Sequence, residues 1–405
     1  MKYILNAALI SLILTLVPTA RASTTWYVNG SNGSDSNNCM SSETACRTIG
    51  HAISLASSDD SIMVAAAIYV ENLTIGISVN VIGSAASATI IDGAGRSTVV
   101  TISSASAQVT LVNVTITNGI HGIYNRGGTL ILNNSAVSHN SAEFGGAGIY
   151  NAGILMINNS TVSANSVGTR CIGNPCPAAG GGIYSSSTLR ISNSTIGQNS
   201  VHLSCSFSYH PYYCQAFGGG IAGGGTLTIN NSTIVGNGVS VSCSSAPGFS
   251  QFCRAFGGGI SISGSTMISN STLSGNWMST QGAGSNIYGS ATLQNSILAN
   301  GPNGGNCAGT INSNGYNLSS DHSCNFNGPG DMNNTDPKLG TLGYYGGETQ
   351  TIPLLSGSPA IDAGNPSGCT DGQGHLLKTD QRGQPRPDPE DTGGCDMGAY
   401  ESQSD

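Results

Sequence analysis

The fold is decided by a stretch that occurs twice: IYNRGGTLILNNSAVSHN at residues 123–140 returns as IYNAGILMINNSTVSAN at residues 149–165. Each copy has a Gly-containing turn after its Ile, an alternating apolar pair, an Asn-Ser pair before an aliphatic residue, and a trailing Asn. The Asn-Ser serines are Ser135, Ser160, Ser194, Ser232, Ser271 and Ser296. The trailing asparagines are Asn140, Asn165, Asn199, Asn237, Asn276 and Asn300. The middle of the chain is therefore an array of repeats.

The repeat length indicates a parallel β-helix. The serines lie 25, 34, 38, 39 and 25 residues apart, and 25 residues suffice for about three short strands with tight turns at roughly 3.3 Å per residue. Apolar residues alternate with polar ones, as at Leu130 and Leu132, and no sustained helical period occurs. Coils that stack about 4.8 Å apart bring equivalent residues together. We expect aliphatic stacks inside, and recurring Asn residues in left-handed corners with amides bonded from coil to coil.

This coil pattern resembles the pectate-lyase-like superfamily of right-handed parallel β-helices. The Gly-Gly-x-Ile and aliphatic-x-x-Asn elements are similar to the repeats of chlamydial polymorphic outer-membrane proteins. The resemblance implies an all-β, right-handed parallel β-helix solenoid over residues 23–320, with an adhesin-like role.

The N-terminal residues predict export followed by a cap. Lys2, an apolar run over residues 4–17 and the sequence Ala20-Arg21-Ala22 are typical of a signal peptide, so residues 1–22 are expected to be removed. No membrane-spanning segment is then predicted, and the protein is expected outside the cell or on its surface. Residues 48–56 predict one amphipathic helix, with Thr48 as its N-cap, covering the first coil.

The C-terminal residues 321–405 carry a different set of motifs: DPKLG at 336–340, GSPAIDAG at 357–364, DQRG at 380–383 and GAYE at 398–401. Their order resembles the choice-of-anchor Q domain of bacterial surface proteins. We expect this region to form an exit cap of β-structure and loops on the solenoid, with Arg382 paired to Glu401 or Asp380.

The twelve cysteines fall into six pairs of near neighbours along the chain. An even number in an exported chain favours disulfides, and neighbour pairing is our prediction. The alternative, structural zinc, would require Cys-x-x-Cys pairs, which do not occur. The predicted pairs are Cys39/Cys46, Cys171/Cys176, Cys205/Cys214, Cys243/Cys253, Cys307/Cys324 and Cys369/Cys395.

Charge limits the chemistry. The net charge is −8 and only 8% of residues are charged, which disfavours nucleic acid as a partner. Glu143 is the only acidic residue between Ser97 and Ser320, whereas a lyase needs several carboxylates for Ca²⁺ and a hydrolase needs a pair. A non-catalytic role is therefore favoured, with a polysaccharide lyase or glycoside hydrolase of the pectate-lyase-like superfamily as the alternative. No cofactor is predicted, although the C-terminal acidic residues could bind Ca²⁺: Asp362, Asp371, Asp380, Asp388, Asp391 and Asp396.

Three longer repeats carry insertions between the trailing Asn and the next Gly-rich Ile, and each insertion holds one cysteine pair. Insertions at the same position of successive coils must project from one edge and stack on each other. Disulfides would stiffen these loops and so lower the entropy cost of ordering them on binding. We predict a glycan or a host or cell-surface protein as ligand. The alternatives are aromatic rings that pack only against each other, with Phe144, Phe217 and Phe256 stacked on the helix, or a lattice-forming structural protein. The predicted ligand-binding residues are Phe207, Tyr209, His210, Tyr212, Tyr213, Phe249, Phe252 and Arg254.

Overall fold

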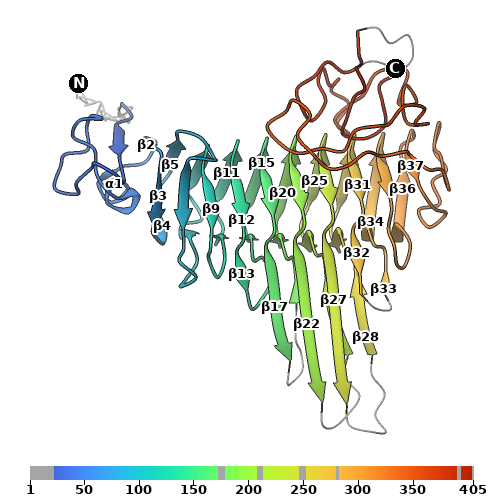
Figure 1. The fold of residues 1–405 in the computed structure, drawn as a ribbon, viewed down its shortest axis with the longest axis horizontal. Helices are drawn as coiled ribbons and strands as arrows, with labels where there is room; N and C mark the ends of the chain where they lie inside the picture. Colours follow the sequence, from blue (N-terminus) through green and yellow to red (C-terminus); the bar gives the residue numbers. More distant parts are fainter. Residues whose placement is uncertain are drawn as a thin grey trace, which may run out of the picture.

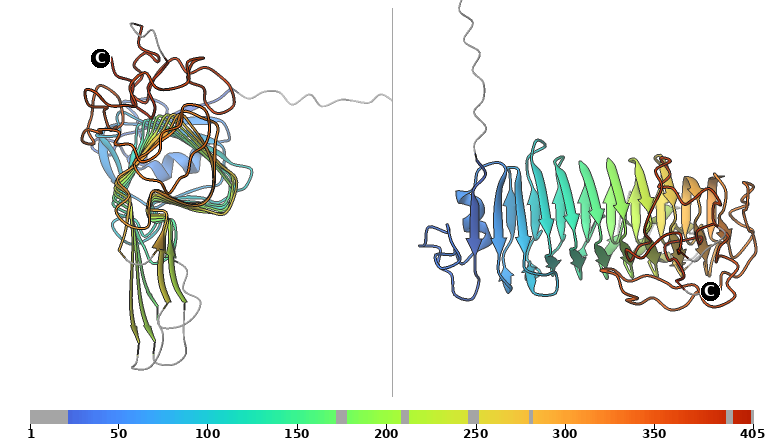
Figure 2. Two further views of the ribbon diagram at one scale, coloured as in Figure 1. Left: turned by 90° about the vertical axis from the view of Figure 1, so that its right-hand side faces the viewer. Right: turned by 90° about the horizontal axis from the view of Figure 1, so that it is seen from above.

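The chain winds as a right-handed parallel β-helix whose coils lie side by side along one axis (Figures 1 and 2). This computed structural model describes residues 22–171, 178–207, 213–245, 252–279, 282–389 and 394–403. The predicted signal peptide lies almost wholly outside the described residues. Within them, no helix combines the length and the apolar character required to cross a membrane.

Two long sheets form the walls of the solenoid. Sheet A contains β1 (Thr25–Val28), β2 (Asp60–Val64), β4 (Leu73–Ile75), β5 (Val79–Gly83), β7 (Val100–Ile102), β8 (Gln108–Val112), β10 (Ile123–Asn125), β11 (Thr129–Asn133), β14 (Ile149–Asn151), β15 (Ile154–Asn158), β19 (Ile183–Ser185), β20 (Thr188–Ser192), β24 (Ile221–Gly223), β25 (Leu227–Asn230), β29 (Ile260–Ile262), β30 (Thr266–Ser269), β34 (Ile287–Gln294) and β36 (Cys307–Ser313). Sheet B contains β3 (Ala67–Val70), β6 (Thr89–Asp92), β9 (Thr115–Thr117), β12 (Ala136–Ser138), β16 (Thr161–Ser163), β21 (Thr195–Gly197), β26 (Thr233–Val235), β31 (Thr272–Ser274), β35 (Ile297–Ala299) and β37 (Leu318–Ser319).

The register confirms that equivalent residues of successive repeats lie over one another. Leu130 pairs with Leu155, which pairs with Leu189 in the next coil. These side chains point inward and are fully buried, as are Val137 and Val162 of sheet B. Continuous aliphatic stacks therefore fill the interior, because period-2 alternation sends every second residue of each strand to the core.

The recurring asparagines divide into two roles that the sequence analysis had merged. The Asn of each Asn-Ser pair occupies the left-handed corner between sheets A and B, with φ near +50° at Asn134 and Asn193. The trailing asparagines form a separate, buried ladder, in which Asn165 Nδ2 donates to Asn199 Oδ1 at 3.0 Å. The ladder was predicted, but its extension to Asn300 is wrong.

Asn300 follows its serine by one residue fewer than the other trailing asparagines. It therefore occupies an exposed left-handed position (φ +54°) in place of the ladder position. The ladder continues instead through Asn286 and Asn306, whose amides are linked at 2.8 Å.

The N-terminal cap agrees with the prediction. Helix α1 (Ile49–Leu55) buries Ile49 and Ala52, and the Thr48 hydroxyl accepts a hydrogen bond from the His51 backbone N–H at 3.2 Å. The Glu71 carboxylate accepts two further N–H groups of the first turn, those of Ile49 and Gly50. The cap is thus held by groups that satisfy the free N–H donors of a helix start.

The C-terminal residues cover the end of the solenoid as predicted, and most of them also extend along its side. Phe326 and the Cys307–Cys324 disulfide cover the end of the core. Residues 336–389 and 394–403, here called the C-terminal segment, lie along the outer face of sheet B (Figure 1). They contact coils that are distant in the sequence. For example, the Thr233 hydroxyl donates a hydrogen bond to Gln381 Oε1 at 2.6 Å. Arg382 pairs with Asp380 at 2.7 Å as expected, whereas the Glu401 carboxylate pairs with the buried Arg386.

The last predicted cysteine pair belongs to the C-terminal segment. Cys369 and Cys395 are disulfide-bonded as predicted, and both are buried. The pair lies against the solenoid, because Asn295 Nδ2 donates to Cys369 Sγ at 2.9 Å and lies 3.7 Å from Cys395 Sγ. Since Asn295 is a corner residue between sheets A and B, this disulfide fastens the C-terminal segment against the side of the solenoid.

Candidate binding site

The insertions project from one edge of the solenoid as a single blade (Figure 1). Two parallel sheets form this blade. Sheet C contains β13 (Ser141–Ala142), β17 (Ser166–Cys171), β22 (Ser200–Phe207), β27 (Gly238–Ser245) and β32 (Trp277–Met278). Sheet D contains β18 (Ala178–Ala179), β23 (Tyr213–Phe217), β28 (Phe252–Phe256) and β33 (Gly282–Ala283). The prediction that the outgrowths share one flank is confirmed.

Disulfides join the two sheets of the blade. Cys205 and Cys243 lie in register on sheet C, and each is bonded to its partner on sheet D, Cys214 or Cys253. Between the sheets, buried alternating residues such as Val201, Leu203 and Val241 form a core separate from that of the solenoid. The blade is thus a rigid, internally packed element.

Five of the six predicted cysteine pairs are disulfides in the structure: Cys39–Cys46, Cys205–Cys214, Cys243–Cys253, Cys307–Cys324 and Cys369–Cys395. Cys171 is also disulfide-bonded, and its predicted partner Cys176 lies outside the described residues.

The predicted ligand-binding residues fall into three groups. Tyr213 and Arg254 are exposed on the outer face of sheet D, where Arg254 is in register with Gln215. Phe207 and Phe252 are described as strand backbone only. The others lie outside the described residues: Tyr209, His210, Tyr212 and Phe249.

A row of aromatic rings on the outer face of sheet A was missed by the sequence analysis. Tyr124 stacks on Tyr150 at 4.6 Å between ring centroids, and Tyr150 stacks on Tyr184 at 5.3 Å. In the next two coils the same position holds Ala222 and Ser261, and Tyr288 then resumes the row. The signal was available, since Tyr directly follows the Gly-rich Ile in four repeats.

The interruption of this row creates a notch at the base of the blade. The notch, of about 390 Å³, has Ala222, Gly223 and Ser261 in its floor, Tyr184 and Tyr288 at its two ends and Phe217 on the blade side. Three coil steps of about 4.8 Å separate the two tyrosines, or roughly 14 Å. The notch therefore offers a small-residue floor between aromatic walls.

The aromatic stack beside the notch differs in one member from the predicted set. Phe217 stacks on Phe256 with 5.3 Å between the ring centroids, and the ring centroids of Phe256 and Tyr288 lie 4.5 Å apart. Phe144, in contrast, lies outside the strands and is 56% exposed. Tyr288 supplies the third ring instead.

The polar groups around the notch are uncharged apart from one cation. Ser261 and Ser263 contribute hydroxyls, and Gln215 with Arg254 lies farther out on sheet D. Burial raises the pKa of the Tyr150 hydroxyl, with smaller contributions from Tyr124 and Tyr184, so the Tyr150 hydroxyl keeps its proton at neutral pH. None of the residues that line the notch is acidic.

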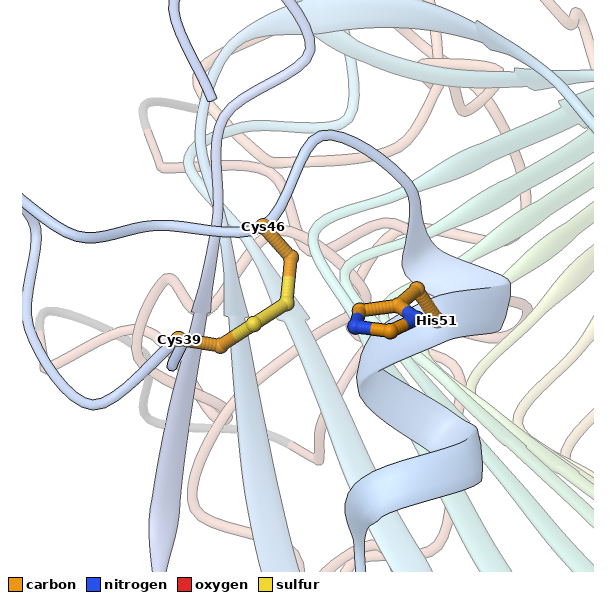
Figure 3. A group of neighbouring side chains, drawn as sticks. All are labelled: Cys39, Cys46 and His51. Carbon is orange, nitrogen blue, oxygen red and sulfur yellow. A yellow bond between two sulfur atoms is a disulfide. The ribbon is translucent and has the colours of Figure 1, made fainter. Parts of the chain in front are cut away.

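Two groups of neighbouring potential metal ligands occur among the described residues, and both consist largely of oxidised cysteines. Figure 3 shows one of them, in which the Cys39–Cys46 disulfide faces His51. The other combines Cys205, Cys214 and Cys243, all disulfide-bonded. Because a thiolate is the ligand form of cysteine, neither group suits a metal ion.

Three of the acidic residues considered for Ca²⁺ accept hydrogen bonds from other groups of the chain. Asp380 accepts from Arg382, Asp371 from His375, and Asp396 from the Ser402 and Asp362 backbone N–H groups. Asp391 lies outside the described residues.

Comparison with known proteins supports the fold. No family model and no curated protein matches the sequence. Among solved structures, the chain is similar to the pectate lyase Pel9A, with a TM-score of 0.50, 13% sequence identity, and coverage of 94% of this chain and 97% of that one. At this identity the likeness concerns the β-helix architecture.

Proposed function

We propose that this protein is a non-catalytic, adhesin-like β-helix that binds a neutral glycan chain in the notch at the base of its disulfide-linked blade. The observation that carries the proposal is the interruption of the tyrosine row by Ala222 and Ser261 between Tyr184 and Tyr288. Aromatic walls present apolar faces to sugar rings, and nearby hydroxyls can bond their hydroxyl groups.

The blade supports this function by rigidity. Binding costs less when the contacting surface is ordered in advance, and Phe217 of the notch belongs to sheet D, which is tied to sheet C by two described disulfides. Tyr213 and Arg254 extend the same outer face of sheet D away from the solenoid.

A polysaccharide lyase activity is the second candidate, and the likeness to a pectate lyase is the observation that favours it. The proposal prefers binding because Glu143 is the only acidic residue between Ser97 and Ser320, and lyase chemistry needs several carboxylates around a Ca²⁺ ion. Export and surface display, as the choice-of-anchor Q resemblance implies, belong to the same proposal.

The decisive experiment fills the notch. Residues 23–405 are screened against immobilised oligosaccharides, and the double variant Ala222→Tyr/Ser261→Tyr is compared with the unaltered chain. We expect binding to fall by at least about tenfold, which corresponds to roughly 1.4 kcal/mol, because the two added rings complete the row and occupy the site.

Thr101→Tyr is the matched control, since Thr101 lies in the same row beside Tyr124 and outside the notch. Equal binding by the filled and control variants would refute the notch as the site. Release of an ultraviolet-absorbing unsaturated uronide from pectate would establish the lyase alternative.

A further inference from the structure

The outer face of sheet B carries recurring polar side chains, and the C-terminal segment covers only its later coils. Corner asparagines and strand threonines repeat along it at the coil spacing of about 4.8 Å. Thr161, Thr195 and Thr233 follow one another in register. The C-terminal segment buries the later members of both rows, whereas Asn134 and Asn159 of the earlier coils are exposed.

The covered half shows what these rows bind. The side-chain amides of Asn231 and Asn295 donate to the main-chain carbonyls of Thr379 and Asp396. The Thr272 hydroxyl accepts from the main-chain N–H of Ala399 at 3.0 Å. Corner amides and strand hydroxyls thus satisfy the backbone of a polypeptide laid over the sheet.

Docking begins one coil after the exposed positions. The Thr195 hydroxyl donates to the Gln350 carbonyl, and the Thr349 hydroxyl donates to the Asn193 carbonyl at 3.1 Å. The preceding coil presents Thr161 in register with Thr195. Its corner residue Asn159 has the same left-handed backbone as Asn193, with φ +47° against +51°.

The exposed half is hollowed into a groove of about 470 Å³. Asn113, Asn134 and Asn159 line it together with Thr115 and Thr161. The loop at residues 84–87 lies on one side, and Tyr344 and Glu348 of the C-terminal segment lie at the other. The single carboxylate among these residues disfavours an acidic ligand.

We propose that this groove binds an extended, weakly charged polypeptide segment of a partner through its main-chain groups, in the way that the adjoining coils bind the C-terminal segment. A polypeptide is favoured over a glycan because the same two residue rows already hold main-chain carbonyls and N–H groups in this molecule. The groove is separate from the notch, which lies on sheet A.

The test uses the full chain and a peptide that copies residues 349–356 (TQTIPLLS), acetylated, amidated and labelled with a fluorophore. This peptide is uncharged and contains the first residues that dock on the covered half. We expect saturable binding by fluorescence anisotropy, weakened about tenfold in Asn134→Gly/Asn159→Gly. Glycine keeps the left-handed corner and removes only the amide.

Asn325→Gly is the matched control, because Asn325 is exposed, has φ +47° and lies outside the groove. Absence of peptide binding, or equal binding by the corner variant and the control, would overturn the proposal. Binding of neutral oligosaccharides that the corner variant abolishes, without peptide binding, would overturn it in favour of a glycan. The notch-filling variant should leave peptide binding unchanged, which separates this result from the fate of the glycan proposal.

Discussion

The buried asparagine ladder links successive coils and should contribute strongly to stability, and replacing its central member tests this. Asn199 has no exposed surface. Its Oδ1 accepts from the Asn165 backbone N–H and from Asn165 Nδ2, both at 3.0 Å. Its Nδ2 donates to the Val162 carbonyl at 2.9 Å and to Asn237 Oδ1 at 3.0 Å. One side chain therefore joins three successive coils.

Asn199→Ala leaves two buried backbone groups without these partners, the N–H of Asn165 and the carbonyl of Val162. An unsatisfied buried group costs about 1–3 kcal/mol, so the free energy of unfolding should fall by about 4 kcal/mol. Asn237 Oδ1 keeps one donor, the Asn199 backbone N–H at 3.0 Å, and therefore adds little to the loss.

Guanidinium denaturation followed by circular dichroism measures this loss. Asn134→Gly is the control, because Asn134 is an exposed corner residue whose left-handed backbone glycine adopts readily. The control should remain within about 0.5 kcal/mol of the unaltered chain. A loss below about 1 kcal/mol for Asn199→Ala, or an equal loss for both variants, would refute the assignment of the ladder as the link between coils.

Two further predictions concern the C-terminal segment and the blade. Burial, with the charge of Glu401 as a second cause, raises the pKa of Asp396 from its usual 3.8 to about 7. The folded chain then retains a proton that the unfolded chain releases, so stability should decline as pH rises from about 4 to about 7, by up to roughly 4 kcal/mol. Urea denaturation should show this slope for the unaltered chain and a flatter one for Asp396→Asn; parallel slopes would contradict it. For the blade, Cys243→Ala/Cys253→Ala opens a loop with a sequence separation of 10. Hydrogen exchange at the backbone amides of Val239 and Val241 should show that the free energy of local opening falls by about 3 kcal/mol, while the core amides of the solenoid exchange as before. Faster exchange throughout both regions would show that the blade and the coils do not open separately.

The solenoid was predictable because its determinants are local and repeated. An Asn-Ser pair sets each corner, alternating residues set each strand, and stacking makes every coil repeat the pattern of its neighbour. The prediction merged the corner and ladder asparagines because sequence distance alone does not separate a residue that turns the chain from one that points inward. At Asn300 a difference of a single residue exchanges these roles.

The notch was missed for a related reason. Tyr184 and Tyr288 belong to the repeat pattern, but Ala222 and Ser261 appear in sequence only as weak matches to it. In three dimensions, two small residues between rings become a hollow, since each side chain on the sheet has its nearest neighbours in the coils above and below. Departures from a stacked row therefore indicate a site more directly than the regular members of the row.

The position of the C-terminal segment could not follow from local pattern at all, since Gln381 meets Thr195 across 186 residues of sequence. The pairing of Cys369 with Cys395 was predictable from their spacing, but the contact of this disulfide with Asn295 was not. The hydroxyls of Thr195 and Thr233 are outward-facing members of a repeat. The C-terminal segment buries them, and Gln381 forms the hydrogen bonds that replace those to water.

A solenoid tends to repeat a residue type from coil to coil, and here Thr115 and Thr161 of the uncovered coils share the outward position of Thr195, with Ala136 between them. Covering the later coils with the chain's own segment therefore leaves threonine hydroxyls able to form the same bonds. Thr161 of the uncovered half lies in register with Thr195 of the covered half, which already bonds a main-chain carbonyl. The physical basis for recognition on sheet B is thus the repeat itself, and the extent of the C-terminal segment determines which coils remain available.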